Sequence, residues 1–167
     1  MSDAERLNDL RKASDLYPAL ERHLGEIIGH KLFTLMVIDR ATDEAARLYS
    51  SDPIAYPVKG RKPLGKLTGW GAQVLDQGRP YIGYNAEDIR SVFFDHETIA
   101  RLGCASVLNL PVLSDGLVIG TVNLLHQEGW YQLEHARRGA PFAALLAPSF
   151  LAWAAKKEHP LAPRPER

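Results

Sequence analysis

The feature that most constrains this chain is a pair of apolar runs within Leu102 to Tyr131, joined by the turn Ser114-Asp115-Gly116. Apolar runs around so short a turn predict an antiparallel hairpin with both faces covered. Each run also contains an asparagine, Asn109 or Asn123, where an aliphatic residue would pack better. A buried amide needs hydrogen-bond partners, which are either neighbouring loops or a bound ligand.

The register of this hairpin decides which side chains share a face. A three-residue loop would place Asn109 opposite Thr121 and Val107 opposite Asn123, whereas a two-residue Asp-Gly turn would reverse one strand unless a bulge restored the register. We choose the three-residue loop, because it gathers the three polar side chains into one patch. The aliphatic side chains then left for the helices are Leu108, Leu110, Val122 and Leu124.

Composition indicates one globular domain over residues 1–157, because 167 residues with 46% hydrophobic side chains can bury a sizeable core. The twenty basic and twenty acidic residues cancel. The protein therefore has no strong electrostatic field that would attract nucleic acid or an anionic membrane. A local basic cluster is interpreted as a solvated loop, and its members are Lys59, Arg61, Lys62 and Lys66.

The amino terminus, MSDAERLNDLRKASDL, lacks the basic-then-apolar order of a signal peptide, and a single cysteine cannot form an internal disulfide. These features predict a cytoplasmic protein. The longest apolar run, Gly139 to Ala155, is shorter than the roughly 18 to 20 residues that span a bilayer. Because Pro141 and Pro148 also interrupt it, we expect a buried or partner-facing helix.

Periodicity and breakers predict an order of helix, two strands, small helix, strand, loop with helix, two strands and helix. The first expected elements are a helix from Ala4 to about Gly29 that Pro18 splits or kinks, a strand over Leu32–Asp39, a second strand ending at about Ser51, and a loop over Asp52–Lys66. A helix capped by Thr68 and ending at Gly78, a strand over Arg79–Gly83 and a helix over Asp95–Leu102 are expected next. After the hairpin we expect a helical region from Trp130 to about Lys157 and a disordered tail over 158–167. Hairpins at both ends indicate an antiparallel α+β fold, with the terminal helices on one face of the sheet and the central insertions on the other.

This order resembles the GAF domain family, and two segments carry the resemblance: GWGAQVLDQGRP, Gly69 to Pro80, and SVLNLPV followed by GLVIGTVNLL, within Ser106 to Leu125. It covers roughly Leu32 to Tyr131, with the flanking helices matching the family's first and last helices. The resemblance implies an antiparallel sheet of five or six strands, a ligand pocket under the central segment and pairing through the terminal helices. The family binds cyclic nucleotides, bilins, haem, amino-acid derivatives and metabolites, so the cofactor stays unknown.

The pocket is expected between the hairpin and the aromatic middle segment. Aromatic walls with one cation suit a small planar or carboxylate-bearing ligand. The ring faces bury the apolar surface of the ligand, and a guanidinium binds a carboxylate through two hydrogen bonds. They equally suit an ordinary core under a lid. The candidate ligand-binding residues are Tyr84, Arg90, Phe93, Phe94, Asn109, Thr121 and Asn123, with Arg90 as the charge partner of a neutral or anionic ligand.

Catalytic chemistry has less support than binding. Free methionine sulfoxide reductases are similar GAF proteins, but they work with several cysteines, whereas Cys104 is the only thiol here and is expected to be a small buried residue. Ala105 follows it where bilin-binding relatives usually have histidine, and His126-Gln127 replaces the Asn-Lys of cyclic-nucleotide binders. In Asp95-His96-Glu97 we expect Asp95 to cap a helix.

No catalytic residue and no metal site is assigned, because the six histidines lie on separate elements. The functional classes are therefore a small-molecule-binding sensory or regulatory module, an enzyme acting on a small metabolite in the same pocket, and a ligand-free dimerisation scaffold. The first is favoured. A homodimer is expected through the apolar side chains of the last helical region, namely Phe142, Leu145, Leu146, Phe150, Leu151 and Trp153.

Overall fold

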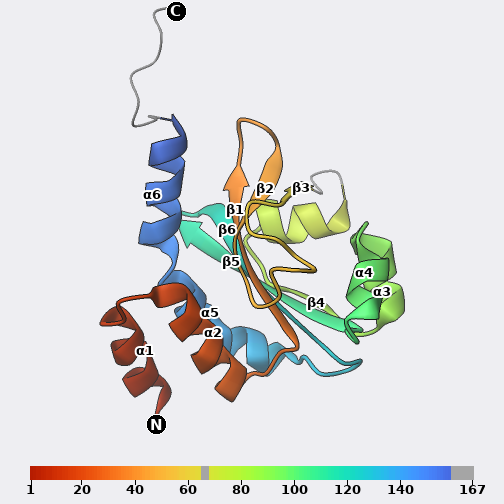
Figure 1. Cartoon of the computed structure of the whole chain (residues 1–167), viewed down its shortest axis with the longest axis horizontal. Helices are drawn as coiled ribbons and strands as arrows, with labels where there is room; N and C mark the ends of the chain where they lie inside the picture. The colour runs from red at the N-terminus through yellow and green to blue at the C-terminus, as the bar shows by residue number, and fades with distance from the viewer. Residues whose placement is uncertain (65–67, 159–167) are drawn as a thin grey trace, which may run out of the picture.

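The computed structural model describes residues 1–64 and 68–158, and its centre is one antiparallel sheet (Figure 1). In that part of the chain the sheet has six strands in the order β3-β2-β1-β6-β5-β4. The strands are β1 (Leu32–Asp39), β2 (Glu44–Ser50), β3 (Arg61–Pro63), β4 (Tyr81–Gly83), β5 (Ser106–Ser114) and β6 (Leu117–His126). The predicted α+β class and antiparallel sheet are confirmed.

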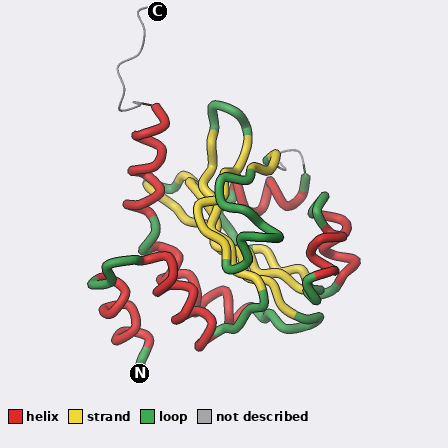
Figure 2. The backbone as a smooth tube through the Cα atoms, viewed as in Figure 1, coloured by secondary structure: helices red, strands yellow, loops and turns green. Residues whose placement is uncertain are grey.

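Helices cover both faces of this sheet, and the terminal ones lie together on one side (Figures 1 and 2). That layer contains α1 (Asp3–Arg11), α2 (Leu16–Ile27), α5 (Leu133–Ala144) and α6 (Ala147–Glu158). Its helices are tied together by an ion pair of Arg138 with Asp3, at 2.9 Å, and a hydrogen bond between Tyr17 and Ser149. The other side carries η1, a π-helix (Gly71–Asp76), α3 (Ala86–Val92) and α4 (His96–Arg101).

The main core lies between the sheet and the terminal helices. Leu108, Leu110, Val122 and Leu124 point into it, as predicted, and are buried with Leu20, Leu24, Phe142 and Phe150. Gly120 of β6 is the point of closest approach, because a Cβ there would clash with the Phe150 ring and lie 2.6 Å from the Met36 carbonyl oxygen. Only glycine lets α6 pack this closely on the sheet.

Three local predictions need correction. The first helical region does divide, but between Arg11 and Leu16, and Pro18 is the third residue of α2, where its missing N–H removes no helix hydrogen bond. The segment Asp52–Lys66 is not wholly a loop, because β3 pairs with the start of β2. An unpredicted helix, α3, begins after Asn85, whose side chain accepts a hydrogen bond from the Asp88 N–H.

The hairpin register also differs from our choice. Ser114 pairs with Leu117, so the turn has two residues, Asp115 and Gly116, both with positive φ (50° and 77°). A bulge between Val112 and Leu113 restores the register, and Asn109 therefore lies opposite Asn123 rather than Thr121. Residues 159–167 of the predicted disordered tail, and Lys66 of the basic cluster, fall outside the described residues.

Candidate ligand pocket

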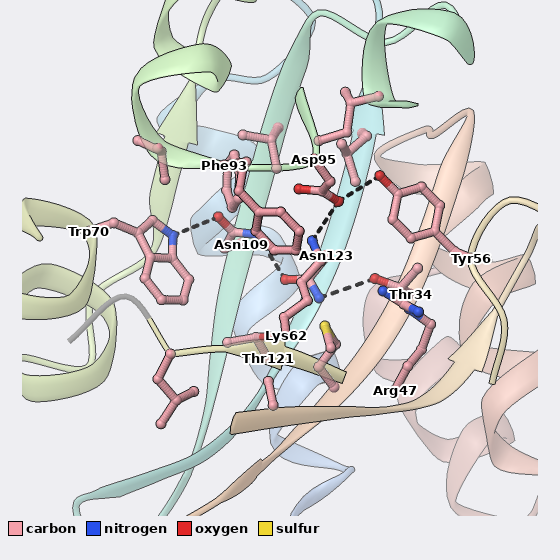
Figure 3. A pocket seen from close by; sticks show the side chains of 18 of the residues that line it. Thr34, Arg47, Tyr56, Lys62, Trp70, Phe93, Asp95, Asn109, Thr121 and Asn123 are labelled. Atoms are coloured by element: carbon pink, nitrogen blue, oxygen red, sulfur yellow. Dashed lines mark hydrogen bonds and ion pairs between the residues drawn. The ribbon is translucent and has the colours of Figure 1, made fainter. Parts of the chain in front are cut away.

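A row of polar side chains crosses the sheet on the face away from the terminal helices. Asn109 and Asn123 are cross-strand partners, and Asn123 in turn faces Thr34 of β1. Asn109 Nδ2 donates to Asn123 Oδ1 over 2.8 Å, and Asn123 Nδ2 donates to Thr34 Oγ1 over 3.2 Å. The Trp70 indole N–H, just before η1, donates to Asn109 Oδ1 over 3.0 Å. The row is thus a continuous chain of hydrogen bonds from η1 to β1 (Figure 3).

Above this row is a cavity of about 210 Å³, enclosed between the sheet and the irregular middle segment. Its lining is mostly apolar, with a few convergent polar groups, which is the usual composition of a small-molecule site. The lining residues are Leu32, Thr34, Met36, Ile38, Ala45, Arg47, Tyr56, Lys62, Pro63, Leu64, Thr68, Trp70, Val92, Phe93, Phe94, Asp95, Ile99, Val107, Asn109, Thr121, Asn123 and Leu125.

An ion pair joins two sides of this cavity. Lys62 Nζ of β3 lies 2.8 Å from Asp95 Oδ2, and the Tyr56 hydroxyl donates to the same oxygen over 2.7 Å. Burial opposes ionisation of Asp95, but Lys62 and Tyr56 outweigh it and hold the pKa of this carboxyl below its usual value. Burial lowers the pKa of Lys62, and Asp95 opposes that shift.

Two earlier interpretations are therefore wrong. Asp95 precedes α4, but its carboxylate makes no capping hydrogen bond and turns instead to Lys62. Lys62 does not belong to a solvated loop, because its side chain is 22% exposed and lies against the rings of Phe93 and Phe94.

Arg47 of β2 supplies the second cation of the cavity. It is 5% exposed, and its Nη1 donates to the Pro57 carbonyl over 3.0 Å. Its guanidinium carbon lies 4.8 Å from the centre of the Tyr56 ring. Burial lowers the pKa of Arg47. A shift in the pairing of β1 with β2 places it here: Leu35 pairs with Tyr49 but Met36 pairs with Arg47, which skips Leu48 and turns Arg47 to the cavity side.

The structure brings together five of the seven residues predicted from the sequence: Asn109, Thr121, Asn123, Phe93 and Phe94 all line the cavity. Tyr84 and Arg90 do not line it, since Tyr84 is 44% exposed beyond β4 and Arg90 is exposed on α3. The polar lining residues that sequence reasoning missed are Thr34, Arg47, Tyr56, Lys62, Thr68, Trp70 and Asp95. Of these residues, only Trp70 could have been found from the sequence, because it lies in the GWGAQVLDQGRP segment that carries the resemblance to GAF domains.

Cys104 lies just before β5 and is 4% exposed, in a cluster with Ile99 and Val107. Burial raises the pKa of its thiol, which disfavours the nucleophilic thiolate. Within the described residues no group of three or more His, Cys, Asp or Glu side chains is placed to hold a metal ion. Residues 1–64 and 68–158 also contain no helix that is long and apolar enough to cross a bilayer.

Solved structures with a similar fold include two that are described as GAF domains. The GAF domain of a phosphoenolpyruvate-protein phosphotransferase from Coxiella burnetii matches with a TM-score of 0.69 at 19% identity, over 93% of this chain and 94% of that one. Free methionine-R-sulfoxide reductase from Neisseria meningitidis, solved with its substrate, matches with a TM-score of 0.67 at 18% identity, over 93% and 89%. The chromophore-binding domain of a bacteriophytochrome from R. palustris matches at 0.66 and 12%, over 93% and 60%.

No family model matches the sequence, and no curated protein matches it. The structural matches together with the sheet order establish that the chain has the GAF fold. The resemblance seen in the sequence is thereby supported at the level of the fold.

Proposed function

We propose that this chain is a sensory or regulatory GAF domain that binds a small neutral or anionic molecule in the cavity above Asn109 and Asn123. The observation that carries the proposal is the cavity itself, which is apolar in most of its lining yet contains three charged side chains and a buried amide row. A cavity that served packing alone would not need buried charges, because removing an ion from water costs free energy unless a partner or a ligand compensates for it. Residues 1–157 act as one domain in this proposal.

The test is native mass spectrometry of freshly purified protein, compared with the same protein after unfolding. A small molecule retained only by the folded chain, and absent from an Asn123→Leu variant, supports binding in this cavity. If nothing is retained, a thermal-shift screen of metabolites follows. A folded wild-type protein that neither retains nor responds to any molecule contradicts the proposal and favours a ligand-free scaffold.

An enzyme acting in the same cavity is the second candidate, favoured by the likeness to the reductase from Neisseria meningitidis. It has less support, because the one thiol is buried outside the cavity lining and has a raised pKa. Turnover of methionine sulfoxide that survives Cys104→Ser, or that is absent altogether, would argue against a thiol mechanism.

We also propose that the protein acts as a homodimer in the cytoplasm, pairing through the terminal helices. Three of the residues expected at the contact, Phe142, Leu146 and Phe150, are fully buried in their own chain and are not available to a partner. Leu151 is 46% exposed and Trp153 is partly exposed on α6, so these two side chains carry the proposed contact.

A further inference from the structure

The charges that line the cavity do not cancel. Among the described residues only Arg47, Lys62 and Asp95 are charged lining groups, and Lys62 and Asp95 form a pair at 2.8 Å. In the described chain no carboxylate lies within ion-pair distance of Arg47. Among the residues that the structure describes, the lining of the cavity therefore has an excess of one positive charge, which is located on the guanidinium of Arg47.

Arg47 is also incompletely hydrogen-bonded. It is only 5% exposed, and its Nη1 donates to the Pro57 carbonyl. Its buried Nε has no hydrogen-bond partner among the described residues. Buried donors almost always have an acceptor, and a buried cation almost always has an anion. An acceptor with negative charge, supplied from the cavity, would satisfy both requirements at once.

The surroundings of Arg47 hold its fork in place. The Tyr56 ring packs against the guanidinium, and the Tyr56 hydroxyl is itself fixed by Asp95. Arg47 pairs with Met36 on the cavity side of β1 and β2. The rest of the lining is rich in aliphatic side chains such as Leu125 and in rings such as Trp70 and Phe93, of which the two rings are labelled in Figure 3. A ligand anchored at Arg47 would therefore direct its other atoms toward an apolar space.

We propose that the ligand is a small monocarboxylate with an apolar, preferably aromatic, body, and that its carboxylate binds the guanidinium of Arg47. This inference rests on the proposed function and names the ligand class of the same cavity. One carboxylate balances the single excess charge, and its two oxygens match the planar fork of arginine. A phosphate monoester has a charge of about −1.5 to −2 at pH 7 and would exceed that balance.

The size of the cavity agrees with this class. Its volume of about 210 Å³ lies below the range of about 300–1,000 Å³ that is usual for drug-sized ligands. A single ring with a short acid side chain is the scale of molecule that it can enclose. The buried Asp95 Oδ1 has no hydrogen-bond partner in the described part of the chain, so it can accept a hydrogen bond from a donor on the ligand.

The experiment measures the affinity of benzoate, phenylacetate and hydrocinnamate, of their primary amides, and of phenyl phosphate, by titration calorimetry and by NMR of the cavity side chains. We expect at least one acid to bind about ten-fold or more tightly than its amide and than phenyl phosphate, because only the monocarboxylate pairs with Arg47. Amides that bind as tightly as the acids would overturn the inference and leave the proposed function intact.

Two variants and a control locate the anchor. In Arg47→Met the acid should bind about thirty-fold or more weakly, and Arg47→Lys should lie between, because lysine keeps the charge but not the fork. Arg101→Gln, which removes an exposed arginine of α4, should bind as the wild type does. Unchanged acid affinity in Arg47→Met would overturn the inference.

A stability measurement separates binding from folding. Because Arg47 is a buried cation with no ion-pair partner among the described residues, ligand-free Arg47→Met should unfold at the same urea concentration as the wild type or a higher one. A marked fall in the urea concentration at which the variant unfolds would show that Arg47 stabilises the fold, and it would count against the proposal. Absence of acid binding while the folded protein retains a neutral or phosphorylated molecule overturns only the ligand class. Absence of any binding overturns the proposed function as well.

Discussion

Asn109 and Asn123 face each other across β5 and β6, and the amide nitrogen of Asn109 donates to the amide oxygen of Asn123 over 2.8 Å. Each asparagine has one further side-chain partner, Trp70 for Asn109 and Thr34 for Asn123. The two amides therefore connect the middle segment to β1, and each still has a second N–H available to a ligand.

This connection predicts strong coupling between the two positions. Asn109→Leu leaves the Trp70 N–H and the Asn123 carbonyl without partners, so we expect a loss of about 1–3 kcal/mol in the free energy of unfolding. The double variant Asn109→Leu/Asn123→Leu should lose less than the sum of the single variants, with an interaction of about 0.5–3 kcal/mol. Urea unfolding of the four proteins measures the cycle, and strictly additive losses would contradict the hydrogen bond.

The ion pair of Lys62 with Asp95 predicts a dependence of stability on pH. The pKa of Asp95 is lower in the folded protein than its ordinary value, despite the opposing effect of burial. Its contribution is therefore fully present above about pH 4, the pKa of an unfolded aspartate, and is lost as the pH falls through the lower folded pKa. Asp95→Asn should destabilise the protein at neutral pH by no more than about 3–5 kcal/mol, and this difference should shrink in acid.

Asp3→Asn is the matched control for that measurement. It removes the same charge from the exposed ion pair with Arg138, so its effect should be at most about 1 kcal/mol. Equal losses from the two variants would show that the cavity pair is no stronger than a surface pair.

The close contact of β6 with α6 predicts that Gly120→Ala is destabilising. The new methyl group would meet the Phe150 ring and the Met36 carbonyl, and the carbonyl cannot move without disturbing the sheet. We expect a loss of about 1–3 kcal/mol in unfolding free energy, as for other overpacked cores. Gly69→Ala, where a Cβ would meet no described atom within 4 Å, should leave stability unchanged or slightly increased.

The proposed dimer predicts that Leu151→Lys gives a monomer. Leu151 is 46% exposed on α6, and a charge at the centre of an apolar contact is poorly tolerated. Ile54→Lys, at a residue that is 93% exposed outside the terminal helices, should leave the assembly unchanged. Sedimentation velocity of the three proteins decides the point, and a monomeric wild type at tens of micromolar would refute the dimer.

The sequence by itself determined the features that depend on neighbours in the chain. The apolar run Leu32 to Asp39 predicted β1 at its observed bounds, and the two asparagines predicted a polar patch on the cavity side of the hairpin. The aliphatic residues next to them in the two strands, Leu108, Leu110, Val122 and Leu124, predicted the side that faces the helices. Alternation along a strand is a local property, so it survives even when the register of the turn is misjudged.

Only the tertiary structure decided which charges enter the cavity. Lys62 and Asp95 meet from β3 and the start of α4, elements far apart in the chain, and neither residue carries a local sign of the pairing. Arg47 reaches the cavity only because β2 skips Leu48 in its pairing with β1, and without that one-residue shift the strand would turn Arg47 toward the helices. Arg90, the cation that the sequence favoured, lies on the exposed side of a helix that the sequence did not predict. Such placements follow from packing between distant segments, which no local pattern encodes.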